Sequence, residues 1–166
     1  MKVEDVMTHD PQTCGPEDDL ATAANVMWDL DCGCVPIVGD GRRIVGMLTD
    51  RDACMAAFLN GRPLHELRVG AVMSKDVATC KATDDLQDAQ ALMRVKRVRR
   101  LPVVDAEDRV VGILSLHDVA RAAAKDKRRF FPKVKLREVA LTFAEVSRPA
   151  AKPAPPALAP NIAYAE

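Results

Sequence analysis

Long apolar runs are missing from this sequence. No segment approaches the roughly 20 consecutive apolar residues that a membrane-spanning helix needs, and the opening residues Met1 to Asp5 lack the apolar centre of a secretory signal. An excess of either charge is missing too, because 24 basic and 24 acidic side chains cancel. We therefore expect a cytoplasmic protein that has no membrane partner and no general attraction to nucleic acid.

Signatures of catalysis and of metal binding are also missing. No nucleophile stands in a recognisable catalytic motif and no glycine-rich phosphate loop is present, so we predict that the chain is not an enzyme and requires no cofactor. Its five cysteines are an odd number, which favours reduced thiols over a disulfide framework. Because Cys32 and Cys34 are closer in sequence than the usual zinc-binding pair, we predict no metal site.

What the sequence does contain is an internal repeat. Val6-Met7 aligns with Val72-Met73 at a shift of 66 residues, and this register holds without a gap until Asp52 meets Asp118. About a third of the aligned positions are identical, where chance would give about one in sixteen. The duplication therefore stands on the sequence itself.

Each repeat has the pattern of a β-α-β-β-α unit. Acidic residues after a short extended segment favour a helix start, and apolar residues follow at helical spacing. Two apolar strands then flank a turn, as in a hairpin, and a second helix follows. The hairpins are expected over 35–48 and 101–114, with the second helices beginning after Thr49 and Ser115. We therefore predict an α/β fold in which the two units pack together to cover their sheets.

Composition divides the chain into four parts, namely repeat 1 (1–62), repeat 2 (63–126), a basic connector with an amphipathic helix (127–146), and an Ala/Pro-rich tail (147–166). That additional helix is indicated by the spacing of Leu136, Val139, Ala140, Phe143 and Val146, and it could dock on the module or on an unidentified protein partner. The tail has little to bury, so we predict that it is disordered.

The repeated motifs resemble a known family. Both repeats open with Val-Met, continue with Val-Pro-Ile or Leu-Pro-Val, and close with Gly-Met-Leu-Thr or Gly-Ile-Leu-Ser followed by x-x-Asp. This resembles a tandem pair of cystathionine-β-synthase (CBS) domains, a Bateman module, over about residues 2–126. The resemblance implies two CBS repeats in a pseudo-twofold arrangement, a homodimer, and clefts that bind AMP, ADP, ATP or S-adenosylmethionine. A stand-alone pair would be a regulatory module that signals by altered packing or dimer arrangement.

The resemblance also implies the ligand contacts. Thr49 and Asp52 in the first repeat, and Ser115 and Asp118 in the second, would hold ribose hydroxyls and a phosphate, for which a carboxylate and a helix N-terminus are suited. The remaining contacts would be to the adenine, along its edge from Gln12, Thr13, Ala78 and Thr79 and on its face from Pro36, Ile37, Pro102 and Val103.

The two repeats differ most before the second strand. The second repeat has Arg99 and Arg100, and by resemblance Arg100 would reach a ligand phosphate, with Arg99 the next candidate. The first repeat has Cys34 where Arg100 stands. We therefore expect unequal sites, of which the Asp118 cleft, with Ser115 and Arg100, binds a nucleotide more tightly.

Simpler interpretations stay open. Thr-x-x-Asp and Ser-x-x-Asp are also capping-box patterns that a helix needs with or without a ligand, and the basic run Lys96 to Arg100 suits a solvated helix end. A ligand-free dimerisation or interaction scaffold is one alternative function. A thiol-based redox regulator that uses Cys32, Cys34 or Cys54 is another.

Overall fold

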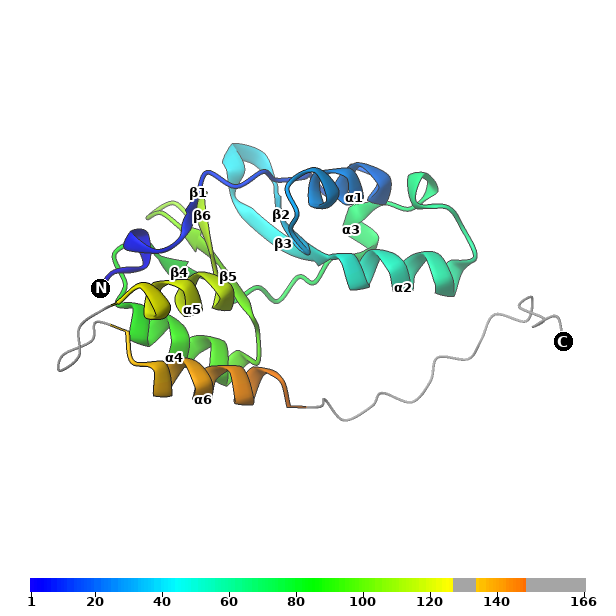
Figure 1. Cartoon of the computed structure of the whole chain (residues 1–166). Coiled ribbons are helices and arrows are strands. Elements are labelled where there is room, and N and C mark those ends of the chain that lie inside the picture. The colour runs from blue at the N-terminus through cyan, green and yellow to red at the C-terminus, as the bar shows by residue number, and fades with distance from the viewer. Residues whose placement is uncertain (127–133, 149–166) are drawn as a thin grey trace, which may run out of the picture.

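The computed structural model describes residues 1–126 and 134–148, which form two similar α/β units (Figure 1). The first unit contains α1 (Leu20–Asp29), β2 (Cys34–Val38), β3 (Ile44–Thr49) and α2 (Asp50–Asn60). The second contains β4 (Cys80–Lys81), α4 (Leu86–Lys96), β5 (Arg100–Val104), β6 (Val110–Ser115) and α5 (Leu116–Lys125). The other elements are η1 (Val3–Asp5), β1 (Thr8–His9), η2 (Asp40–Arg42), η3 (Leu64–Glu66), α3 (Val69–Val72) and α6 (Leu136–Val146).

The predicted fold class is confirmed, as is the helix near the C-terminus, which is α6. Residues 127–133 of the predicted connector and 149–166 of the predicted tail lie outside the described residues. Within the described ranges, no helix has the length and apolar character that crossing a membrane requires.

The sheets follow the predicted hairpins. In the first unit β2 and β3 pair antiparallel, and in the second β5 and β6 do so in the matching register. The second sheet is extended to four strands in the order β1-β6-β5-β4, with β4 parallel to β5. The first unit has the counterpart of that parallel pairing as a single bridge from Cys14 to Ile37.

A pseudo-twofold axis relates the units. Arg43 and Arg109, which the 66-residue shift aligns, form an antiparallel bridge with each other. A residue can lie opposite its own repeat equivalent only close to the axis that exchanges them. Ile44 N donates to the carbonyl of Asp108 at 3.2 Å at the same place, so the two hairpins meet there.

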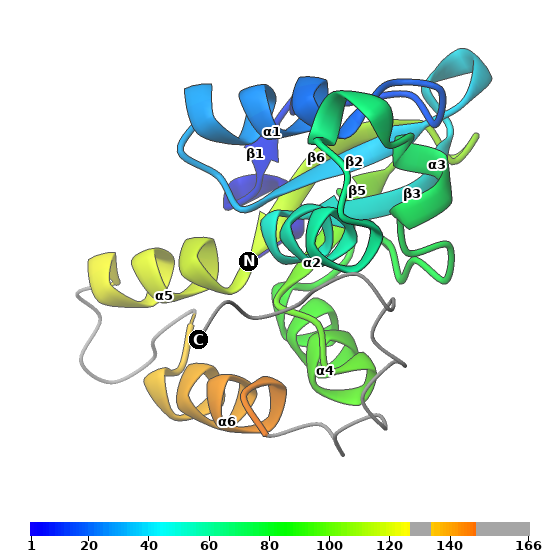
Figure 2. The same ribbon diagram turned by 90° about the vertical axis from the view of Figure 1, so that its right-hand side faces the viewer.

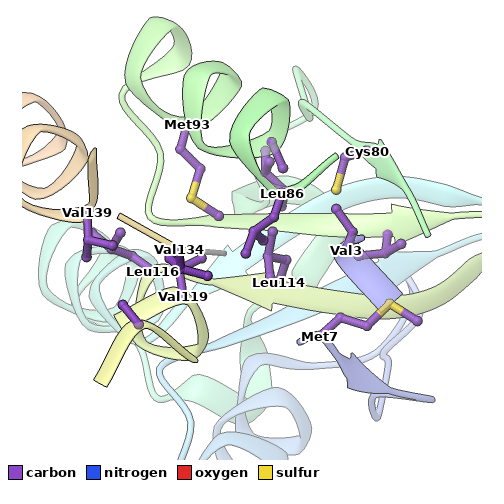
Figure 3. Close-up of a cluster of buried hydrophobic side chains, with 14 of the residues drawn as sticks. Val3, Met7, Cys80, Leu86, Met93, Leu114, Leu116, Val119, Val134 and Val139 are labelled. Carbon is purple, nitrogen blue, oxygen red and sulfur yellow. The ribbon is translucent and has the colours of Figure 1, made fainter. Parts of the chain in front are cut away.

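The two hydrophobic cores do not follow the order of the sequence. Val3 and Met7, which open the first repeat, are buried in the core of the second repeat, where Figure 3 shows them with Leu114. Reciprocally, Leu67 and Val69 are buried in the core of the first repeat. Each unit therefore completes its core with the segment that opens the other, which makes the two units mutually dependent.

Two aligned glycines permit this exchange. A Cβ on Gly46 would collide with the side chain of Met73 and lie 3.1 Å from the carbonyl oxygen of Ser74. A Cβ on Gly112 would meet Met7 in the same way, and the Thr8 carbonyl oxygen at 3.1 Å. The crossing segments pass so close to the hairpins that only glycine fits without rearrangement.

Helix α6 covers the helices of the second unit. It packs on α4 and α5, as both views show (Figures 1 and 2), and it contributes Val139 and Val146 to the core beneath. Thr142 is fully buried, and its Oγ1 accepts a 2.8 Å hydrogen bond from Arg94 Nη1. The predicted amphipathic helix therefore docks on the module itself.

Candidate functional site

The second helix of each unit begins with the same capping box. At α2, Thr49 Oγ1 donates to Asp52 Oδ2 at 2.7 Å, while the Asp52 backbone N–H donates back to Thr49 Oγ1 at 3.2 Å. At α5, Ser115 Oγ donates to Asp118 Oδ2 at 2.5 Å, and the Asp118 N–H returns a bond of 3.2 Å. The capping interpretation of both motifs is thus confirmed, and it accounts for one carboxylate oxygen of each aspartate.

The other carboxylate oxygen distinguishes the two sites. Arg121, one turn further along α5, donates to Asp118 Oδ1, and Asp118 is only 6% exposed. The residue aligned with Arg121 is Met55, which carries no charge. The carboxylate of Asp118 is therefore neutralised within its own helix, whereas Asp52 is half-buried and faces a cavity.

That cavity has a volume of about 470 Å³ and lies between the two repeats. The start of α2 forms one wall, and residues before β4 and at the start of β5 form the other. It is lined by Gly33, Cys34, Met47, Thr49, Asp50, Arg51, Asp52, Ser74, Asp76, Val77, Ala78, Val98, Arg99, Arg100 and Pro102. The site is thus composite, because neither repeat could form it alone.

Arg100 is the residue whose position differs most from expectation. In the β5–β6 register it stands opposite Ser115, but its Nη2 lies 3.4 Å from the point where a Cβ on Gly33 would be. Arg100 therefore lines the cavity that contains Thr49 and Asp52, whereas Ser115 and Asp118, with which it was predicted to group, do not line it. Leu101 and Val103 turn into the core of their own unit, and strand alternation sends Arg100 towards the facing unit.

Of the remaining predicted residues, Arg99, Ala78 and Pro102 also line the cavity. Ile37 and Val103 do not, because both side chains are 0% exposed and belong to the cores, contrary to the prediction. The others lie outside this lining, namely Gln12, which is exposed, Thr13 and Thr79, which are half-buried, and Pro36, which is buried in β2.

Sequence reasoning missed three of the cavity residues before β4, namely Ser74, Asp76 and Val77. Ser74 reaches the cavity because its backbone pairs with Met47 of β3, through hydrogen bonds of 2.9 and 3.0 Å. Asp76 follows two residues later and lines the same cavity. The available signal was the aligned Val-Met motif, since this motif marks the segment that crosses to the other unit.

Charges of both signs line the cavity. Arg51, Arg99 and Arg100 supply positive charge, while Asp50, Asp52 and Asp76 supply negative charge. The Cys34 thiol lies in the same wall, and its burial raises its pKa to about 11, an effect that the Arg100 charge partly opposes. Cys34 is therefore a neutral thiol at physiological pH. No group of histidine, cysteine and carboxylate side chains that could hold a metal ion occurs among residues 1–126 and 134–148.

Comparison with known proteins defines the class. The CBS domain model matches residues 3–58 and 69–125, so the chain belongs to the CBS domain family and carries two such domains in tandem. It is 36% identical over 118 residues to the CBS domain-containing protein YhcV of Bacillus subtilis, an alignment that covers 71% of this chain and 82% of YhcV. It is 33% identical to an inosine-5'-monophosphate dehydrogenase of Methanocaldococcus jannaschii, but the match over 76% of this chain spans only 25% of that enzyme.

Solved structures show the same fold with ligands. CBSX2, in complex with AMP, has a TM-score of 0.64 and 27% identity, covering 76% of this chain and 98% of that one. The CBS domain pair of MJ0100, in complex with 5'-methylthioadenosine and S-adenosylmethionine, has a TM-score of 0.67 and 25% identity, covering 73% and 94%. The chain therefore has the architecture of a Bateman module.

Proposed function

We propose that this chain is a regulatory module that binds an adenosine nucleotide in the cavity between Asp52 and Arg100. The proposal depends on one observation, namely that residues of both repeats line this cavity. The N-terminus of α2 lies in one wall and Arg99 and Arg100 lie in the other. Its volume of about 470 Å³ is within the range of small-molecule sites. The CBS pairs that are known with bound AMP, 5'-methylthioadenosine or S-adenosylmethionine support an adenosine ligand.

Each part of such a ligand would have a suitable partner. The carboxylate of Asp52 would accept hydrogen bonds from the ribose hydroxyls, since it keeps one oxygen beyond those used in the capping box. Arg100 and the first N–H groups of α2 would hold a phosphate. Pro102 and Val98 would lie against the adenine face, with backbone groups at Ala78 near its edge.

The wall at the start of β5 favours a phosphate. Two neighbouring arginines, Arg99 and Arg100, would attract the anionic tail of AMP there. We therefore propose AMP, ADP or ATP as the ligand class. Because the ligand would contact both repeats, its binding would alter how the two units pack. This change in packing would be the signal that the module transmits.

Thermal denaturation of the full chain with a panel of adenosine compounds tests this proposal. We expect AMP to raise the melting temperature more than 5'-methylthioadenosine, which has no phosphate. A ligand at about 100 times its dissociation constant stabilises the folded state by about 2.7 kcal/mol, which is readily measured. If no adenosine compound raises the melting temperature at millimolar concentration, the sensor function is abandoned in favour of the ligand-free scaffold.

The redox alternative has less support. Burial raises the pKa of Cys14 and Cys34 to about 11 and that of Cys80 to about 12, which leaves these thiols protonated and unreactive. Cys54 is exposed, but it lies on α2 outside the cavity.

A further inference from the structure

A second cavity, which we call the α6 cavity, lies between the N-terminal ends of α4 and α6. Its volume is about 230 Å³. The two helices pack against each other, as both views show (Figures 1 and 2). Its polar lining includes Asp85, Asp88 and Gln90 at α4, and Lys135 and Glu138 at α6. It shares no lining residue with the cavity at Asp52, so the two are separate.

Gln90 contributes a buried acceptor that has no donor. Its side chain is only 2% exposed, and its Oε1 has no hydrogen-bond partner. Of the buried side-chain nitrogen and oxygen atoms in residues 1–126 and 134–148, it is the single one left unpaired. An unpaired buried acceptor costs free energy, so a donor that the chain does not supply would stabilise it. The helix does not require an amide here, since the 66-residue shift aligns Gln90 with Ala24.

The carboxylate of Asp85 does not have the role of its repeat equivalent. Asp19, at the aligned position, caps α1 by accepting a 2.8 Å hydrogen bond from the Thr22 N–H. Asp85 makes no such side-chain bond at the start of α4. Its Oδ1 lies 3.2 Å from Lys2 Nζ instead, in a pair whose side chains are each about half exposed. Such a pair is weak, so the Asp85 carboxylate is available to a ligand.

Carboxylates outnumber cationic side chains in the lining. Those of Asp85, Asp88 and Glu138 stand against the single ammonium group of Lys135, whose side chain is exposed. Glu138 lies 3.6 Å from Arg94, but Asp88 forms no ion pair within the described part of the chain. No cluster of carboxylates that could hold a metal ion occurs among the described residues. A suitable ligand therefore carries N–H donors that are spaced along its length.

We propose that the α6 cavity binds a small organic diamine. One ammonium group would donate to Gln90 Oε1 and to the Asp88 carboxylate, and the other would reach Glu138 on α6. The compound would thereby join α4 to α6 and hold α6 more firmly on the module. This binding is independent of the nucleotide at Asp52.

Isothermal titration calorimetry of the full chain with putrescine (1,4-diaminobutane) at low ionic strength tests the proposal. Gln90→Leu, which removes the acceptor and keeps a similar shape, should weaken binding about 10-fold or more, as loss of a hydrogen bond to a charged group does. Asp88→Asn should weaken it by a similar factor. Asp29→Asn is the matched control, since it removes the same charge from an exposed residue of α1 outside the cavity. It should bind like the wild type.

Amide hydrogen exchange supplies an independent measurement. Putrescine should slow exchange in α6 and at the start of α4 but not in α1, and uncharged 1,4-butanediol should have little effect. Circular dichroism verifies the fold of each variant, and exposed Asp88 keeps the test valid if Gln90→Leu does not fold. The proposal is overturned if millimolar putrescine gives no heat of binding, which would mean that the cavity holds water only, or if Asp88→Asn and Asp29→Asn bind it equally well.

Discussion

The two repeats share one capping box and use it differently. Asp52 and Asp118 make nearly identical bonds to Thr49 and Ser115, yet Asp52 faces a cavity with Arg100 while Asp118 is paired with Arg121. Local interactions were thus retained after duplication, and the difference came from residues elsewhere. The motif itself is the same in both repeats, so it is the surroundings of the motif that distinguish a candidate ligand site from a structural cap.

The largest expected effect concerns Arg100. Arg100→Ala should weaken AMP binding about 10- to 100-fold, because hydrogen bonds to a charged group contribute about 1.5–3 kcal/mol. Arg121→Ala, which removes the partner of Asp118 outside the cavity, should change the affinity much less. Isothermal titration calorimetry measures both, with Arg97→Ala as a control that removes an arginine outside the cavity. Equal losses in Arg100→Ala and Arg121→Ala would erase the distinction between the cavity at Asp52 and the cap at Asp118.

The aligned glycines should show where the repeats remain equivalent. Gly46→Ala and Gly112→Ala should each lower the free energy of unfolding by about 1–3 kcal/mol, because the new methyl group overpacks the crossing segment. Urea denaturation gives the values. Gly15→Ala is the control, since its nearest contact would be an ordinary 3.8 Å to Asp18. A neutral result at either glycine would mean that the exchanged segment is loosely held there.

Removing each carboxylate should give opposite results in the two repeats. Asp118→Ala should cost about 1–2 kcal/mol of stability, because it removes a buried cap and leaves Arg121 without its partner. Asp52→Ala should cost less stability and more AMP affinity. Chemical denaturation and calorimetry on the same two variants check this crossed pattern. If Asp118→Ala loses more affinity than Asp52→Ala, the second repeat is the principal site.

The smallest expected effect is in thiol chemistry. At pH 7 iodoacetamide should modify exposed Cys54 before Cys34, whose pKa burial raises to about 11, because the thiolate is the reactive form. Cys34 should become reactive only as the pH approaches that value. Mass spectrometry of timed samples measures the order. Early modification of Cys34 would revive the redox alternative for the first repeat.

Much of the fold could be predicted from local pattern. Apolar periodicity and capping residues predicted the helices and hairpins of both units, and α6 was predicted from five apolar positions. The exchange of Val3 and Val69 between the cores could not be predicted, because a short apolar segment does not reveal which sheet it will cover. The same limit applied to Ile37 and Val103, whose neighbouring prolines were equally apolar but lay on the other face of the strand.

Individual residues of the candidate site were predicted, but not which of them lie together. Motifs pointed to Thr49, Asp52, Arg99 and Arg100, whereas Arg100 was expected in one site with Asp118. Sequence proximity suggested that grouping, since Arg100 and Asp118 belong to one repeat. The pseudo-twofold packing instead turns the start of β5 towards α2 of the other unit.

The sequence by itself determined the duplication, the order of elements, and the capping of α2 and α5, because these depend on residues a few positions apart. Only the tertiary structure decided which aspartate shares a cavity with the arginines of the second repeat, which core each opening segment completes, and which helix face α6 leaves bare. Those outcomes depend on how two equivalent units pack together. A pattern that is nearly the same in both repeats carries little information about which segment of one repeat contacts which segment of the other.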